Sequence, residues 1–277
     1  MLANSIHSEA RLRFSWGEAE AKTKLIERSL GGLCHLSKGY WDGGMVMLQL
    51  VNPTAGMFAG DSLELSIELD ARAQVAITSP SATRFHTMKD AESACLSQSI
   101  TIGDKAFLEY WPEMVIPQRG SSTVQETVLQ IHGGGSVLFF DAVAPGRVAH
   151  NEVNAYRSYL NSIDVYVGGA LKARERLKLE PKRGSWGKLV PDWDACYLAT
   201  LWVYSANSTS TEAEVSRLVS ALEEELGGLC AFSDLGEGLG VFRLLAPDAI
   251  IFQKLSKGLR SIVYDSLAAH QINFRKI

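Results

Sequence analysis

The feature that most constrains the fold is a series of short segments in which apolar and polar residues alternate. About nine such segments lie between Glu9 and about Arg176, and many are separated by glycine, asparagine, aspartate or proline. They are RLRFSW, MVMLQLV, SLELSIELD, QVAITS, LSQSITI, AFLEYW, ETVLQIH, SVLFFDAVA and IDVYVGG. A period of two is what a strand with one buried face requires. Because helices do not alternate with them, the sequence predicts a mainly β fold with packed sheets and disfavours a doubly wound parallel sheet.

The C-terminal part of the chain has a different pattern. Residues 211–226 open with Thr211 and Glu214 and stop before a glycine pair, which predicts a helix with a capping box. Residues 247–270 predict a second helix, although Gly258 inside it costs about 1 kcal/mol relative to alanine. Residues 229–246 between them predict two strands joined by the turn DLGEG. We therefore expect one domain over 1–277, with a β-rich body over about 9–200 and two late helices.

Bulk composition narrows the environment and the partners. The chain has 277 residues, 46% of them hydrophobic, which suffices for a sizeable core. A formal charge of −4 gives no general attraction to nucleic acid or to anionic membranes. Neither a signal peptide nor a run of roughly 18 apolar residues is visible, so we expect a soluble cytoplasmic protein. The four cysteines have no C-x-x-C spacing and are expected to be free thiols.

The stretch NPTAGMFAGD, residues 52–61, raises the possibility of a phosphate-binding loop. A Walker A loop needs a lysine after its last glycine, whereas Asp61 follows Gly60 and would repel phosphate. A dinucleotide fingerprint must open a helix, but a predicted strand follows. The interpretation that remains is a turn between strands, formed by four residues: Asn52, Pro53, Gly56 and Gly60.

Residues 78–88, TSPSATRFHTM, combine hydroxyl groups with Arg84 and His86. A serine near His86 could suggest a hydrolase, but no G-x-S-x-G elbow surrounds Ser79 or Ser81. We therefore favour a polar loop at one end of the β body over a catalytic serine.

Two further clusters contain carboxylates. Glu109 and Glu113 flank Pro112; the period of two places Glu109 on the face of Phe107, although an exposed edge position is the simpler interpretation. In FFDAVAPGRVAHNE, the turn-forming pair Pro145 and Gly146 separates Asp141 from Arg147 and His150. Such an aspartate and arginine most often form a local ion pair or cap the turn, and they also suit a polar interior passage.

No local metal site is visible in the sequence. The six histidines show neither H-x-x-x-H nor H-E-x-x-H spacing. Cys34 and His35 are adjacent, but neighbours on a strand face opposite ways and make a poor chelate. A metal ligand set therefore remains unknown at this point.

Five stretches, in order, resemble the urease accessory protein D family, also called UreD or UreH. They are NPTAGMFAGDSLELSIEL, AITSPSATRFHTM, FLEYWPEMVIPQRGS, APGRVAHNE and LKARERLKLEP. The family pattern contains N-P-x-G-G-x-x-x-G-D-x-L, T-T-P-x-A-T-K-x-Y-R, L-E-x-x-P-x-x-x-I-P and G-R-x-A-x-G-E. The chain departs from it mildly, at Ala55, Arg84, His86 and Asn151.

The resemblance implies a helical stack of β-strands with two C-terminal α-helices and a chaperone without catalytic activity. Such a protein would act with accessory proteins F and G on the urease apoprotein. It would help deliver nickel, hold no permanent cofactor, and depend on GTP only through the partner GTPase. Residues that would line or gate a hydrated ion path are Asp61, Thr83, His86, Glu109, Asp141, Arg147 and Glu175. Weak serial contacts suit transport, because a tight site would not release the ion.

Other interpretations remain open. A carbohydrate-active β-stack enzyme could use Asp61, Glu109 or Asp141 as an acid and base pair. A related scaffold could mature a different metalloenzyme. For the expected partner surfaces, candidate aromatic anchors are Trp111, Tyr156, Tyr159 and Trp186, with core packing as the alternative for each.

Overall fold

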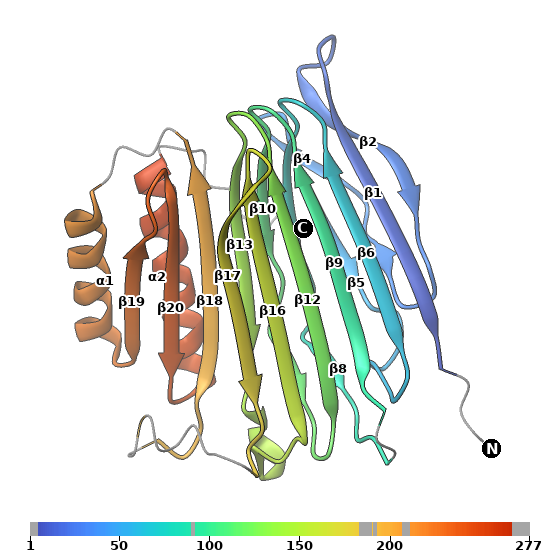
Figure 1. Ribbon diagram of the computed structural model, residues 1–277, viewed down its shortest axis with the longest axis vertical. Coiled ribbons are helices and arrows are strands. Elements are labelled where there is room, and N and C mark those ends of the chain that lie inside the picture. The colour runs from blue at the N-terminus through green and yellow to red at the C-terminus, as the bar shows by residue number, and fades with distance from the viewer. Residues whose placement is uncertain (1–4, 90–91, 183–189, 191–192, 207–210, 268–277) are drawn as a thin grey trace.

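A computed structural model describes residues 5–89, 92–182, 190, 193–206 and 211–267 (Figure 1). One sheet has seven strands, in the spatial order β17 (Ala170–Leu179), β16 (Ser158–Val167), β12 (Ser122–Ile131), β9 (Ala94–Ile102), β6 (Ser62–Leu69), β1 (His7–Gly17) and β2 (Lys22–Ser29). The other has eleven: β19 (Leu229–Asp234), β20 (Leu239–Ala246), β18 (Tyr197–Ser205), β13 (Ser136–Val143), β10 (Phe107–Trp111), β7 (Gln74–Thr78), β5 (Met45–Val51) and β3 (His35–Leu36), with β4 (Tyr40–Asp42), β8 (Thr83–Phe85) and β11 (Val115–Pro117) attached beside them.

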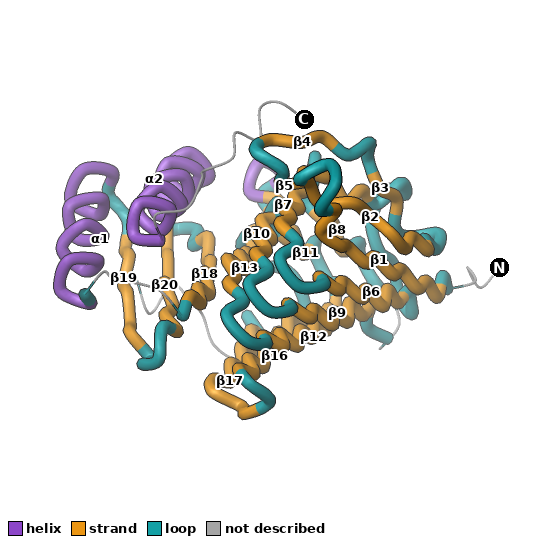
Figure 2. The backbone as a smooth tube through the Cα atoms, turned by 90° about the horizontal axis from the view of Figure 1, so that it is seen from above, coloured by secondary structure: helices purple, strands orange, loops and turns teal. Residues whose placement is uncertain are grey.

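The remaining elements lie at the end of the β body and on its flank. A short pair, β14 (Gly146–Arg147) and β15 (Glu152–Val153), surrounds the 3-10 helix η1 (Val148–His150). Two helices, α1 (Glu212–Leu226) and α2 (Ala249–Leu267), cover the outer face of β18, β20 and β19 (Figure 2).

The body is a β-solenoid, because the chain passes back and forth between the two sheets. From β5 to β16 the long strands alternate between them, so β6, β9, β12 and β16 become parallel neighbours in one sheet. Strands β5, β7, β10 and β13 become parallel neighbours in the other. The mainly β, stacked fold expected from the resemblance is confirmed.

The alternating pattern does not predict whether neighbouring strands run parallel or antiparallel. Half-buried alternating strands are typical of antiparallel sheets, and parallel strands usually need a helical crossover. In this solenoid each crossover is a strand of the opposite sheet, so both sheets remain parallel at their centre without intervening helices. Antiparallel pairs occur nearer the ends of the two sheets, where β2 pairs with β1 and β18 pairs with β13.

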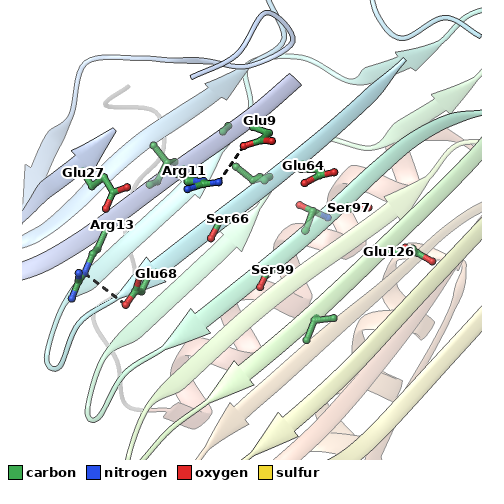
Figure 3. A pocket seen from close by; sticks show the side chains of 15 residues that line it. Glu9, Arg11, Arg13, Glu27, Glu64, Ser66, Glu68, Ser97, Ser99 and Glu126 are labelled. Carbon is green, nitrogen blue, oxygen red and sulfur yellow. Dashed lines mark hydrogen bonds and ion pairs between the residues drawn. The ribbon is translucent and has the colours of Figure 1, made fainter. Parts of the chain in front are cut away.

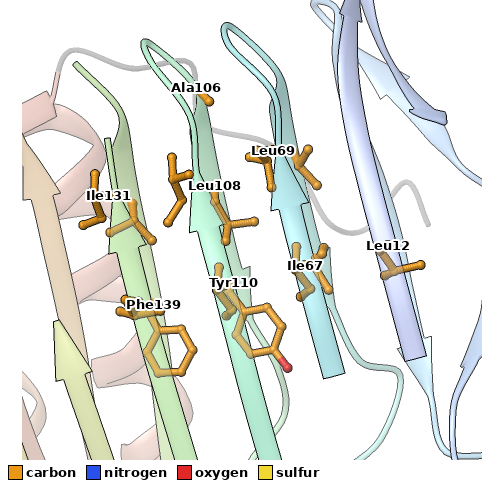
Figure 4. Packing of buried hydrophobic residues seen from close by; sticks show 14 of the residues in the cluster. Leu12, Ile67, Leu69, Ala106, Leu108, Tyr110, Ile131 and Phe139 are labelled. Carbon is orange, nitrogen blue, oxygen red and sulfur yellow. The ribbon is translucent and has the colours of Figure 1, made fainter. Parts of the chain in front are cut away.

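The solenoid core lies between the two sheets. Its apolar part gathers inward-facing side chains from successive coils, and the figure labels eight of them (Figure 4): Leu12, Ile67, Leu69, Ala106, Leu108, Tyr110, Ile131 and Phe139. A second apolar cluster lies on the other face of the eleven-stranded sheet, where α1 and α2 pack. The eleven-stranded sheet is therefore buried on both faces in this region, which explains the continuous burial of β13.

The helices agree closely with the predicted segments. Thr211 is the N-cap of α1, and its hydroxyl and the Glu214 carboxylate form the predicted capping box. Within the described residues, α2 ends at Leu267, so 268–270 of the predicted helix lie outside them. Gly258 has a packing role, because a Cβ there would lie 2.5 Å from a methyl carbon of Leu222 in α1. None of the helices of the described chain is long and apolar enough to cross a membrane.

Several strands were not predicted from the sequence. β2 and β18 are long but lack a clear alternation, and β17 alternates but is rich in charged residues. β3, β4, β8, β11, β14 and β15 are very short. The predicted strands at 229–246 and their connecting turn are present as β19 and β20.

Candidate functional site

Asp61 closes the turn that the sequence analysis predicted. Its carboxylate accepts hydrogen bonds from the backbone N–H groups of Ile6 and Phe58, each at 2.8 Å, and its side chain is buried. The Asn52 side chain accepts from the backbone N–H of Thr54 at 2.9 Å, as in an Asx turn. Gly60 has a φ of 80°, a conformation that favours glycine. Both Asp61 oxygens therefore bind backbone, which is the geometry of a cap.

Thr83 and His86 lie beside this turn at the end of the solenoid. Nε2 of His86 lies 2.9 Å from the carbonyl oxygen of Ala55, and its ring stacks on Phe58 at 4.5 Å between centroids. Thr83 lines two small cavities of about 80 and 110 Å³, and the smaller one reaches Cys34 and Tyr110. The larger is lined mainly by polar groups and the smaller mainly by apolar side chains of the core.

Glu109 is fully buried, so the exposed edge position favoured by the sequence analysis is wrong. Its side chain shares the face of Phe107, as the period of two indicated, because both point away from the solenoid core toward α2. Arg260 of α2 donates to both carboxylate oxygens, with Nη2 at 2.8 Å, and the Tyr264 hydroxyl donates at 2.6 Å. Burial opposes the charge of Arg260, but the bonds and charge of Glu109 outweigh it and raise its pKa.

Asp141 lies on the inward face of β13 and is held by neutral groups. The amide of Gln125 donates to Oδ1 at 2.7 Å, and the amide of Asn161 donates to Oδ2 at 2.5 Å. Gln125 and Asn161 are register partners on β12 and β16, directly across the interior from β13. Burial raises the pKa of Asp141 to about 6; the two amides oppose this shift and the charge of Glu175 adds to it.

Glu175 belongs to the same buried region. Its Oε1 accepts from Nη1 of Arg243 at 2.6 Å, and the same nitrogen lies 3.2 Å from the hydroxyl of Thr200. Asp141, Thr200 and Arg243 are in register across β13, β18 and β20. A row of polar side chains on one sheet therefore faces a second row on the other.

We call the polar side chains of these two facing rows, with those beside them in the interior, the polar band. Its hydrogen bonding is incomplete. Six of its buried side-chain atoms have no hydrogen-bond partner within the described part of the chain: Oγ1 of Thr123, Oε1 of Gln125, the hydroxyl of Tyr159, Oδ1 of Asn161, Oε2 of Glu175 and Nε1 of Trp202. Buried polar atoms are normally paired with protein or with ordered water. These unpaired atoms could bind water molecules or make transient contacts with a small polar species.

The expected local ion pair between Asp141 and Arg147 does not form. The guanidinium of Arg147 instead donates two hydrogen bonds to Glu152, from Nε to Oε2 at 2.8 Å and from Nη2 to Oε1 at 2.6 Å. Because β13 is paired inside the sheet, Asp141 points into the solenoid while the turn carries Arg147 to its end. The hydrogen bonds from Arg147 lower the pKa of Glu152 to about 2.

The seven predicted path residues thus occupy separate places. Asp141 and Glu175 meet in the polar band, His86 and Arg147 line a groove of about 520 Å³ at the end of the solenoid, and Thr83 lines the two small cavities. Asp61 caps its turn, and Glu109 lies under α2. Sequence reasoning missed the partners Gln125, Asn161, Thr200, Arg243, Arg260 and Tyr264. The first four could have been found as polar residues at inward positions of strands, had the strands and their register been known.

A wider hollow of about 670 Å³ lies on the outer face of the seven-stranded sheet (Figure 3). Its carboxylates stand apart on a solvent-exposed surface, where Arg11 contacts Glu9 at 3.2 Å and Arg13 contacts Glu68 at 3.7 Å. Such exposed pairs contribute little to stability. Across the described ranges, three His, Cys, Asp or Glu side chains nowhere gather in a way that could hold a metal ion.

Of the two roles considered for the candidate aromatic anchors, the structure supports core packing. Tyr156 and Tyr159 are buried in the core, and Trp111 stacks on Phe140 at 4.2 Å within the cluster beneath the helices. Trp186 lies outside the described residues. Core packing is therefore the role of the three that are described.

Comparison with known proteins identifies the family. The model of the UreD urease accessory protein family matches residues 7–276. The chain is 30% identical over 259 residues to the urease accessory protein UreD of Opitutus terrae, covering 92% of this chain and 93% of that protein. It is 33% identical over 207 residues to the UreD of Mycolicibacterium gilvum, covering 74% of each. The chain therefore belongs to the family of UreD urease accessory proteins, a membership that implies a role in urease maturation.

Proposed function

We propose that this protein is a non-catalytic scaffold that joins the urease apoprotein to the accessory proteins F and G and passes nickel toward the urease active site. The ion is cargo that contacts the chain transiently, and the protein keeps no permanent cofactor. GTP is hydrolysed by the partner GTPase. The protein works in the cytoplasm, where its four free thiols suit a reducing compartment.

The observation that carries this proposal is the polar band between the sheets. Buried carboxylates normally have a cation, yet Asp141 is held by two neutral amides. Glu175 binds Arg243 with Oε1, and its Oε2 has no partner in the described chain. Around them lie hydroxyl groups, the carbonyl oxygens of the two amides and an indole N–H that also lack partners there. A row of weak oxygen ligands can exchange with the water of a hydrated ion without trapping it.

The surroundings of Thr83 support a route into this band. The two small cavities share Thr83 in their lining, and the smaller one reaches Tyr110. The hydroxyl of Tyr110 donates to Gln98, whose amide donates to Thr127 next to the band on β12. A chain of hydrogen bonds therefore leads from the wall of the smaller cavity toward Gln125 and Asp141, although the other residues of that wall are mostly apolar.

An enzyme is less well supported by the geometry. A glycosidase needs two carboxylates flanking an accessible bond. Of the three acids considered, Asp61 is occupied by backbone amides, Glu109 is sealed by Arg260, and Asp141 lies inside the solenoid. Between urease and another metalloenzyme as the client, membership of the UreD family favours urease.

Coexpression with urease subunits and the other accessory proteins in a defined nickel medium tests the proposal. Omitting this protein should leave urease without activity, and full activity in its absence would overturn the scaffold role. Asp141→Asn changes charge with almost no change in shape, so the assembly should still form while the nickel content of purified urease falls. Wild-type nickel content with Asp141→Asn and with Glu175→Gln would show that these acids are structural.

A further inference from the structure

A groove at the end of the solenoid has features that the polar band does not explain. It holds about 520 Å³ and lies where β8, β11, β14, η1 and the start of α2 converge, at the lower end of the molecule in Figure 1. Its floor is apolar and is formed by Met114, Ile116, Ala144, Tyr197 and Ala249.

Large apolar side chains stand exposed around this groove. Val148 of η1 lines it and is 37% exposed, and Ile250, next to the lining residue Ala249, is 68% exposed. Phe58 is 46% exposed and stacks on the lining residue His86. An apolar hollow with several exposed apolar side chains at its rim is typical of a protein interaction site.

The charged groups that line the groove are all basic. They are Arg84 and Arg147, with His86 and His150 beside them, and among the described residues the lining contains no carboxylate. Two acids lie close to this lining. Glu152 on β15 is buried and binds Arg147 with both oxygens, which offsets the charge of that arginine. Asp248, whose charge adds to burial in raising the pKa of Tyr197, accepts from the backbone N–H groups of Ile250 and Ile251, so Arg84 carries most of the uncompensated positive charge. This sign is opposite to the net charge of −4 on the whole chain.

From these features we propose that the groove docks an acidic amphipathic segment of a partner protein. Apolar side chains of that segment would cover Val148 and Ile250, and its carboxylates would pair with Arg84 and the free face of Arg147. A second copy of this chain fits poorly, because a symmetric contact would set the same cations against one another. The inference rests on the proposed scaffold role, since it supplies one docking surface of that assembly.

Three variants test the two parts of the surface. Val148→Asp places a charge in the apolar wall, and Arg84→Glu reverses a cation that is exposed on the short strand β8. Ile26→Asp is the matched control, because Ile26 is 53% exposed on β2, an edge strand of the seven-stranded sheet. Each tagged full-length variant is purified after coexpression with urease subunits and accessory proteins, and every copurified protein is quantified.

We expect Val148→Asp and Arg84→Glu each to reduce recovery of the same partner by about tenfold, while Ile26→Asp leaves it unchanged. Thermal unfolding of the purified variants should match the wild type. The binding should also weaken as salt rises, and less steeply in Arg84→Glu. Amide hydrogen exchange at residues 146–150 should slow in the wild-type assembly.

Wild-type recovery of all partners with both groove variants would overturn the inference. Loss with Val148→Asp but not with Arg84→Glu would overturn the acidic character of the partner segment. These results are distinct from failure of the scaffold role, which would appear as full urease activity when the protein is omitted. If the groove has no function, both groove variants should form intact assemblies, although nickel loading of urease still requires this protein.

Discussion

Two buried carboxylates on neighbouring strands of one sheet have opposite surroundings. Glu109 on β10 faces α2, and Asp141 on β13 faces the solenoid interior. Glu109 receives a forked arginine and a tyrosine hydroxyl. Asp141 receives two amides and, within the described residues, no lysine or arginine. A buried carboxylate is therefore paired with a cation on the face toward α2 and, in the described chain, has no such partner on the face toward the solenoid interior.

This difference separates a structural acid from a candidate functional one. A compensated buried ion pair fixes the position of one element against another, and Glu109 fixes α2 against the solenoid. An uncompensated buried acid lowers stability at neutral pH, so its presence calls for another reason. In Asp141 that reason is, on our proposal, contact with a passing cation.

The largest expected effect is at the compensated site. Arg260→Met removes the cation and leaves Glu109 buried without it, so the free energy of unfolding should fall by about 3 to 5 kcal/mol. Urea unfolding followed by circular dichroism measures this change. Adding Glu109→Leu to the same chain should recover much of the loss, because both buried charges are then gone. A loss below about 1 kcal/mol in the single variant would contradict the locking role of this pair.

The second effect concerns the uncompensated site and depends on pH. The pKa of Asp141 is about 6 in the folded chain against 3.8 when unperturbed, a difference worth about 3 kcal/mol. The folded protein therefore binds more protons than the unfolded chain between these values, and this acid destabilises the fold as pH rises toward 6. Asp141→Asn should accordingly stabilise the protein by up to about 3 kcal/mol near pH 7.

The pH profile of the same variant supplies the control. Near pH 4 the aspartate is neutral in the fold, while in the unfolded chain, with a pKa of 3.8, it is little more than half ionised. The stabilisation should therefore fall to about a third of its pH 7.5 value at pH 4.5 and vanish below about pH 3.8. Carboxylates with a lowered pKa, such as Glu152 and Asp164, contribute less to the free energy of unfolding as pH falls. This loss is the same in the wild type and in Asp141→Asn, so it cancels in the difference between them. Urea unfolding at about pH 4.5 and pH 7.5 tests the difference. Equal differences at both values would mean that Asp141 is ionised normally in the fold.

Much of the fold could be predicted from the sequence because its signals are local. The period of two identified half of the strands of the body, including most of the long ones, and Thr211 with Glu214 located the start of α1 within one residue. Strand direction and register could not be predicted, because neighbours in each sheet come from different coils. β17 was missed although it alternates: its cations Lys172, Arg174, Arg176 and Lys178 face outward, and the inward face between them carries the acid Glu175 among apolar residues.

The site residues show the same limit. The period of two correctly paired Glu109 with Phe107 on one face, but it could not show that α2, 151 positions later in the chain, supplies Arg260. Proximity in sequence suggested an ion pair between Asp141 and Arg147, and the sheet instead separated them. Partners from distant coils decide the chemistry of each acid, and a single sequence does not contain that information.

The smallest effects should distinguish the two sites by the loss of one hydroxyl group. Tyr264→Phe removes a donor from buried Glu109 and should cost about 1 to 3 kcal/mol, because that donor bonds a charged group. Tyr159→Phe is the matched variant in the interior, where the hydroxyl is buried and has no partner among the described residues. Because water bonds this hydroxyl if the band is hydrated, its removal should change the free energy of unfolding by less than about 0.5 kcal/mol. Equal costs, measured by urea unfolding, would mean that the interior hydroxyl is as firmly bonded as the one beneath α2, and the contrast between a sealed site and a hydrated one would fail.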